Sequence, residues 1–265
     1  MATKYSDFIH LPDFLPVYDI LEEGPSSWQS FIPTAQFNEM LQRSLTAITS
    51  SEISKRRSIW VRGTFGTGKS HASAVVKHLL CDDYDSIKTY IENINDPALK
   101  SQVRNLRQNK RYFAVTLKGV QQAYDIPRFT LSLQREVSKA VKAVEPDFVV
   151  NSDFTAAINW IEGHRRIFEE EVIPNAKDLV DNINTADEAI TFLRNYNPGM
   201  YITIENSIRE TIGSVFEQTA IAEWLSEVEQ EIEKRGIANG LIIFWDEFTS
   251  VMDTLKSDRI NLLQN

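Results

Sequence analysis

The sequence predicts an α/β fold with a mostly parallel sheet, a large helical insertion and an N-terminal arm. Three features predict it: a glycine-rich octet between an apolar segment and an amphipathic helix, a late apolar run that ends in two carboxylates, and helical periodicity between them. The 265 residues are 42% hydrophobic and 25% charged, which is ordinary for a globular protein. A chain of this length and composition can bury a substantial core.

Residues 1–57 are predicted to form an arm and a helix that pack on the domain containing the octet. Prolines at positions 12, 16, 25 and 33 break any long helix in the arm. Thr34 is a suitable N-cap for a helix whose apolar residues fall at positions 37, 40, 41, 45 and 48.

The octet at residues 63–70, GTFGTGKS, fits the phosphate-binding pattern G-x-x-x-x-G-K-S, known as the P-loop. The preceding residues 58–62 are β-branched and aromatic, as a strand requires, and apolar residues at 72, 75, 76, 79 and 80 predict a helix. A strand, a glycine-rich loop and a helix together predict that a nucleoside triphosphate binds here. The alternative is a glycine-rich turn that binds nothing.

Each residue type in the octet suits a phosphate site. The glycines let backbone N–H groups line a cradle, and the N-terminus of the following helix favours the same anion. Lys69 would contact the β and γ phosphates, and the Ser70 hydroxyl would ligate Mg²⁺. The predicted nucleotide-binding residues are Gly63, Thr64, Phe65, Gly66, Thr67, Gly68, Lys69, Ser70 and His71. For His71, packing beside the strand is the simpler interpretation.

The second motif is the run GLIIFWDE at residues 240–247. A continuous apolar run suits a strand that is buried on both faces of a parallel sheet. At its end Asp246 would hold Mg²⁺ and Glu247 would activate water, so the predicted catalytic residues are Glu247 and Lys69 and the predicted metal ligands are Ser70 and Asp246. A pair of acids favours hydrolysis of the nucleotide by an activated water over transfer of its phosphate to a bound substrate. The alternative is a strand that ends in a solvated acidic turn.

A large insertion separates the two motifs, since Lys69 and Asp246 are 246 − 69 = 177 residues apart and a βαβ unit needs about 30. Residues 112–117 are predicted to form another strand. Residues 120–238 are predicted to form an acidic helical insertion, which includes one long helix from Ser207 to Gly236. Residues 120–235 carry 11 basic and 21 acidic residues, a net charge of −10. The predicted domains are 1–57, 58–119, 120–238 and 239–265.

One basic stripe precedes the insertion, with Lys100, Arg104, Arg107 and Arg111 at helical spacing. A solvated helix face is the simpler interpretation, and a contact to nucleic acid or to an acidic subunit is the alternative. The four histidines have no neighbouring His or Cys at metal-ligand spacing, so no zinc site is predicted. No guanine-recognition motif is apparent, which leaves ATP and GTP open.

Residue composition also suggests a compartment. No apolar run approaches the roughly 18 residues that cross a bilayer, the N-terminus has no apolar signal region, and Cys81 is the sole cysteine, so no internal disulfide forms. We expect a cytoplasmic protein with no membrane contact.

Residues 60–71 resemble the P-loop of large prokaryotic phage-defence ATPases, in particular the AAA+-like ATPase of BREX-type bacteriophage-exclusion systems. The aromatic residue at position 65, the ending Gly-Lys-Ser-His, and the segment Ile243–Phe248 with the following Arg259–Gln264 carry the resemblance. The ATPase of the RADAR defence system is a further AAA+-like candidate. The match covers about 58–80 and 240–264.

The resemblance implies ATP and Mg²⁺ as cofactors, assembly into a homo-oligomeric ring, partner proteins of a defence system, and work on or near nucleic acid. It implies that the base contacts the segment before the P-loop strand, where Phe31, Ile32 and Pro33 are the candidates. It also implies a sensor residue and an arginine finger, which are expected beyond residue 265. The open alternatives are an ATP-stabilised scaffold or sensor without turnover, and a translocase stimulated by nucleic acid.

Overall fold

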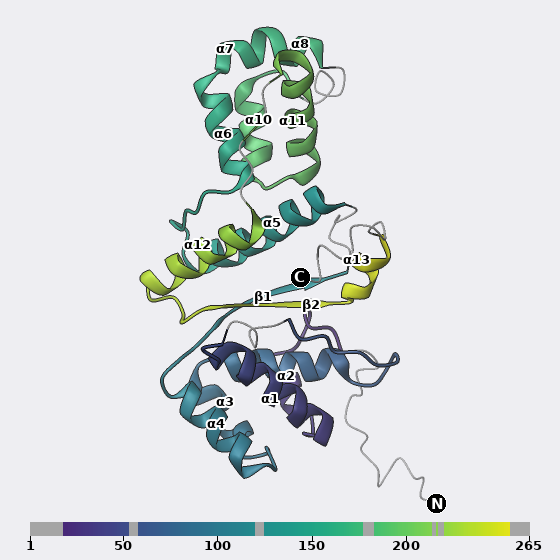
Figure 1. The fold of residues 1–265 in the computed structure, drawn as a ribbon, viewed down its shortest axis with the longest axis vertical. Helices are drawn as coiled ribbons and strands as arrows, with labels where there is room; N and C mark the ends of the chain where they lie inside the picture. Colours follow the sequence, from purple (N-terminus) through teal and green to yellow (C-terminus); the bar gives the residue numbers. More distant parts are fainter. Residues whose placement is uncertain are drawn as a thin grey trace, which may run out of the picture. The chain divides into compact units, whose positions relative to one another are not determined.

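The computed structural model describes residues 18–52, 58–119, 125–176, 183–213, 216 and 220–254. It has an α/β fold that is mostly helical, with a small two-stranded parallel sheet (Figure 1). The chain divides into two compact units, residues 1–111 and 112–265. The predicted domain 58–119 therefore contributes to both units.

The first unit is built from helices. After the short 3₁₀ turn η2 (Ser27–Ser30) come α1 (Ala35–Thr49), α2 (Lys69–Cys81), α3 (Tyr84–Ile91) and α4 (Pro97–Arg107). The predicted cap is confirmed, because the Thr34 hydroxyl accepts a hydrogen bond from the Phe37 amide at 3.2 Å. Helix α2 contacts η2, α1, α3 and α4, so the helix that follows the octet lies at the centre of the unit.

The predicted strand at residues 58–62 is wrong. These residues have no regular structure, and the side chains of Ile59, Trp60 and Val61 are 39–43% exposed. The reason is physical: a strand needs a neighbouring strand for its backbone N–H and C=O groups, and the described elements of the first unit are all helical. Local propensity for a strand is not sufficient without that neighbour.

The second unit contains the sheet. Strand β1 (Phe113–Lys118) pairs in parallel with β2 (Leu241–Asp246), in a register that sets Phe113 opposite Leu241 and Lys118 opposite Asp246. The predicted second strand and the apolar run before the two acids are thus both strands. Burial on both faces was wrong for β2, because all six of its residues are only half-buried.

Between the strands, all regular structure in the described residues is helical, as predicted. Helices α5 (Ile126–Val144) and α12 (Ile221–Lys234) share a core with the sheet that includes Val115, Val137 and Trp224 (Figure 1). The predicted single helix from Ser207 to Gly236 is wrong, because α11 ends at Ile212 and Gly213 has a left-handed φ of 71° that stops it.

A second core lies within the insertion and is separate from the sheet's core. It is formed by α6 (Asp153–Gly163), the π-helical turn η4 (Phe168–Val172), α8 (Ile173–Asn175), α10 (Ala186–Arg194) and α11 (Pro198–Ile212), together with Leu131 of α5. The short α7 (Arg165–Ile167) joins α6 to η4 and has no buried residue. The last element, α13 (Phe248–Thr254), follows β2. Among the described residues, no helix combines the length and hydrophobicity that a membrane span requires.

Candidate functional site

The octet forms an exposed turn that leads directly into α2. Gly66 and Gly68 have φ values of 77° and 78°, a conformation that glycine adopts without strain, and Gly68 is the N-cap of α2. The turn bends back on itself so closely that a Cβ at Gly63 would stand 3.0 Å from the Thr67 hydroxyl oxygen. Glycine is thus favoured by its positive φ at two positions, and at the third a Cβ would crowd a neighbouring side-chain oxygen.

Lys69 and Ser70 are the first two residues of α2, where helix N–H groups have no intrahelical acceptor. The Lys69 side chain runs back over the turn, and its ammonium donates to the Thr64 carbonyl at 2.7 Å. The same ammonium is therefore held at the turn, where it could exchange the carbonyl for a phosphate oxygen. The closely wound glycine turn, the lysine and the positive end of a 13-residue helix fit a phosphate group.

An aromatic side chain, Phe31, lies beside the turn. The Phe31 ring is 3.9 Å from the position of a Cβ at Gly68, and Phe31 also contacts the ring of His71, with centroids 5.1 Å apart. Ile32 and Phe65 are 79% and 88% exposed. Of the predicted base-contacting residues, Phe31 is thus the one that the structure places against the turn.

His71 packs on the N-terminal arm. Its ring stacks on Tyr18 with centroids 4.1 Å apart, and its Nε2 lies 3.3 Å from the Trp28 carbonyl oxygen. Burial lowers the pKa of His71, so the ring is neutral at pH 7. The predicted packing beside a strand is replaced by packing against the arm.

The acidic motif belongs to the second unit, at the carboxyl end of β2. Asp246 is half-buried, its carbonyl accepts from the Gly119 amide at 2.9 Å, and its carboxylate accepts from the Glu247 amide at 2.9 Å. Glu247 is exposed and has a φ of 56°, which is uncommon for a residue other than glycine. Strained backbone is concentrated at functional sites, so this φ favours a role for the turn.

Aromatic packing holds the acidic turn in place. The Trp245 indole stacks on Phe129 with centroids 5.3 Å apart, and its Nε1 donates to the Gly119 carbonyl at 2.8 Å. Phe248 packs edge-on against Trp245. The glycine-rich turn of residues 63–70 and the acidic turn belong to different units.

The residues of the basic stripe contact acidic side chains and backbone carbonyls within their own unit. Arg104 pairs with Glu92, the Lys100 ammonium donates to the Glu92 carbonyl at 2.8 Å, and Arg111 pairs with Asp83 at 2.8 Å. Arg107 is only 4% exposed, so the interpretation of the whole stripe as a solvated face was wrong for this residue. Glu92 and Asp83 offset two of the four positive charges, and the burial of Arg107 removes a third from contact with a nucleic-acid backbone.

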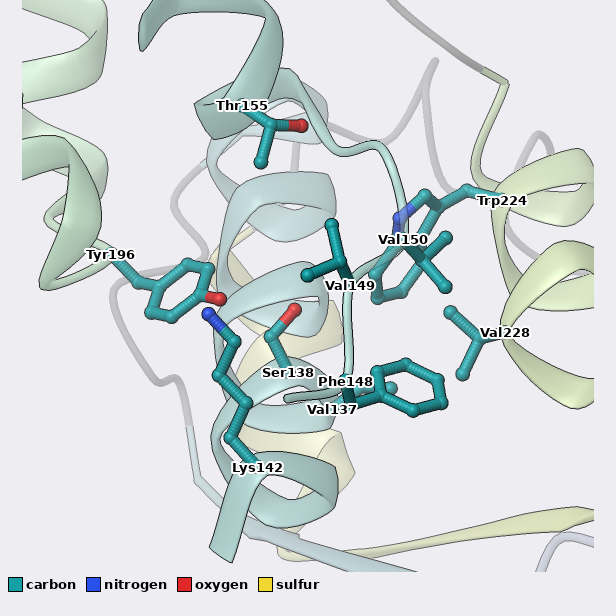
Figure 2. A pocket seen from close by; sticks show the side chains of 10 residues that line it. All are labelled: Val137, Ser138, Lys142, Phe148, Val149, Val150, Thr155, Tyr196, Trp224 and Val228. Atoms are coloured by element: carbon teal, nitrogen blue, oxygen red, sulfur yellow. The ribbon is translucent and has the colours of Figure 1, made fainter. Parts of the chain in front are cut away.

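A small hollow lies in the second unit between α5, α6 and α12 (Figure 2). Its walls include Val137, Phe148 and Val228, and the Trp224 indole N–H faces no acceptor in the described part of the chain. The free volume is about 20 Å³, enough for about one water molecule, so the hollow is not a nucleotide site. In the described ranges, no group of three or more His, Cys, Asp or Glu side chains is arranged to hold a metal ion.

Sequence reasoning missed a cluster of ionisable side chains near the C-terminal end of α2. Glu23 of the arm contacts Lys77 and His78, His78 also contacts Asp82 just after the helix, and Trp28 stacks on His78 with centroids 4.7 Å apart. Glu23 and His78 are 55 positions apart, and no motif links such distant residues.

The comparisons with known proteins leave the family open. No family model, no curated protein and no solved structure matches this chain. A function is therefore inferred from the glycine-rich turn, the acidic turn and their chemistry.

Proposed function

We propose that this chain binds ATP with Mg²⁺ at residues 63–70 and hydrolyses it as a subunit of an oligomeric prokaryotic antiviral complex. The observation that carries the proposal is the exposed turn in which Gly63, Gly66 and Gly68 permit a tight curl at the N-terminus of α2. Backbone N–H groups in such a turn, with a lysine at its end, suit a triphosphate. The antiviral role rests on the sequence resemblance.

The roles of the residues follow from their chemistry. Lys69 neutralises the phosphates, and Ser70 and Asp246 would hold Mg²⁺, which when bound withdraws charge from the phosphate oxygens. Glu247 orients and deprotonates the attacking water. Hydrolysis therefore requires that the acidic turn of the second unit meet the phosphate-binding turn of the first.

The base would lie against Phe31. An aromatic ring beside the phosphate-binding turn offers a stacking surface that any base can use, worth about 1–3 kcal/mol in other proteins. Competition between ATP and GTP for the full-length chain measures the preference for one base.

The test is ATP binding and phosphate release by the whole chain in its oligomeric state. We expect Lys69→Met to abolish ATP binding, and Glu247→Gln to retain binding but lose phosphate release. Glu227→Gln, at an exposed position of α12, is the matched control and should behave as wild type. No ATP binding by the wild-type chain would refute the proposal.

The same assay separates the alternative functions. Equal, near-zero phosphate release by the wild type and Glu247→Gln, with intact ATP binding, would indicate an ATP-stabilised scaffold or sensor. Stimulation of phosphate release by DNA or RNA would indicate a translocase. The internal pairing of Lys100, Arg104 and Arg111 argues against a translocase that grips nucleic acid through α4.

A further inference from the structure

The arm covers one face of α2 through four of its residues. Tyr18 and Phe31 contact His71, Glu23 contacts Lys77, and Trp28 stacks on His78. His71 and His78 are seven positions apart, about two helical turns, and therefore lie on the same side of α2. The arm thus runs along the helix that carries Lys69 and Ser70.

Glu23 is the polar centre of this contact. Its carboxylate accepts hydrogen bonds from the Lys77 ammonium and the Tyr18 hydroxyl, and one oxygen lies 2.9 Å from His78 Nε2. The Glu23 side chain is only 11% exposed. Burying a carboxylate is costly unless it is paired and hydrogen-bonded, and here it has three partners.

The charges around Glu23 favour its ionised form. Burial raises the pKa of Glu23, but the hydrogen bonds from Lys77 and Tyr18 outweigh burial, so that the pKa lies below its ordinary value. The other face of His78 is also occupied, because its Nδ1 lies 2.6 Å from the Asp82 carboxylate. Breaking the Glu23 contact would leave the half-buried Lys77 ammonium without this carboxylate.

The far end of the arm meets the phosphate-binding turn. Phe31 ends the segment that Glu23 and Trp28 fix to α2, and its carbonyl accepts from the Tyr90 hydroxyl at 2.7 Å. Its ring then lies beside Gly68. The ring also packs on Phe37 of α1, with centroids 5.0 Å apart, so the arm is one of two supports that place the ring beside the turn of residues 63–70.

We propose that Glu23 is a positioning residue for nucleotide binding: by holding the arm on α2 it holds the Phe31 ring beside the phosphate-binding turn. This inference rests on the proposed function. Glu23 acts through Phe31 on the base, and it makes no contact with the phosphates.

The test compares two ligands on the full chain: Mg·ATP, which has a base, and Mg²⁺ with inorganic triphosphate, which has none. We expect Glu23→Gln to weaken ATP binding about tenfold, within the range that loss of one base–aromatic stack produces, and to change triphosphate binding less than twofold. Glu22→Gln is the matched control, because Glu22 is the exposed neighbour and should leave both affinities unchanged. Phe31→Ala should reproduce the loss, and adding Glu23→Gln to it should have little further effect.

Equal loss of ATP and triphosphate affinity, or no loss of either, would overturn the inference. If the wild type binds neither ligand, the proposed function fails, and hydrogen exchange still tests the arm. Glu23→Gln must then speed amide exchange in residues 27–31 while Glu22→Gln does not, and unchanged exchange would overturn the role of Glu23. If Glu23→Gln does not fold, Tyr18→Phe removes one bond to the same carboxylate and takes its place.

Discussion

Arg107 is expected to stabilise the C-terminal end of α2 against local unfolding. Its guanidinium donates to the Leu79 carbonyl at 2.7 Å and to the carbonyls of Asp82 and Lys110. The residue is 4% exposed, and two of its acceptors flank Cys81, the sole cysteine of the chain. Replacing Arg107 with leucine therefore leaves carbonyls without their donor at a site that water reaches poorly.

The magnitude follows from the number of bonds lost. Each buried acceptor left without a partner costs about 1–3 kcal/mol, and partial access of water to some of them reduces the sum. We expect Arg107→Leu to cost about 3 kcal/mol in the local opening of this region. The matched control is Arg104→Leu on the same helix, which loses one exposed ion pair with Glu92, worth about 0–1 kcal/mol.

Cys81 provides the assay. Burial raises the pKa of the Cys81 thiol to about 12, so the native thiol reacts slowly with a disulfide reagent near pH 8. If labelling proceeds through local opening, 3 kcal/mol corresponds to labelling about 100-fold faster in Arg107→Leu, against about fivefold or less in Arg104→Leu. Arg107 itself lowers the pKa of this thiol, so removing its charge alone would slow labelling. Equal labelling rates in the two variants would refute the reasoning.

Four further variants or conditions test other parts of the structure. The pKa of Glu23 is below its ordinary 4.5 because its hydrogen bonds outweigh burial. Its stabilisation of the arm is therefore present above pH 4.5 and is lost as the pH falls through the lower pKa of the folded state. Trp28 fluorescence should report an acid transition that is absent from Glu23→Gln. Gly63→Ala should weaken ATP binding tenfold or more by calorimetry with little change in melting temperature, because its Cβ would stand 3.0 Å from a neighbouring oxygen within an exposed turn. Gly240→Ala should destabilise the second unit by about 1–3 kcal/mol in urea, because φ is 145° and its Cβ would lie 2.9 Å from a carboxylate oxygen. Ile161→Ala, fully buried in the α6–α11 core, should cost about 2–5 kcal/mol in the same experiment, and a cost below 1 kcal/mol would contradict that core.

The features that sequence reasoning predicted correctly depend on near neighbours in the chain. Thr34 caps α1, and both strands of the sheet match their apolar runs. In the octet, Gly66 and Gly68 adopt the positive φ values that a tight glycine-rich turn uses. In each case a few adjacent residues contain the whole physical reason.

The features that were missed depend on distant parts of the chain. Residues 58–62 have strand propensity, but a strand forms only beside another strand. Arg107 has the same spacing as its exposed neighbours, and only the carbonyls around it explain its burial. Glu23 meets His78 across 55 positions, a contact that neither periodicity nor composition encodes.

The pairing of β1 with β2 has a consequence for synthesis on the ribosome. The two strands begin 241 − 113 = 128 residues apart, so β1 emerges long before its only partner in the described sheet. At about 5–20 residues per second this delay lasts roughly 6–26 s, during which an apolar strand edge stays open to other nascent chains. The α6–α11 core emerges within that interval and needs no residue of either strand, so it can fold first and shorten the loop that β2 must close.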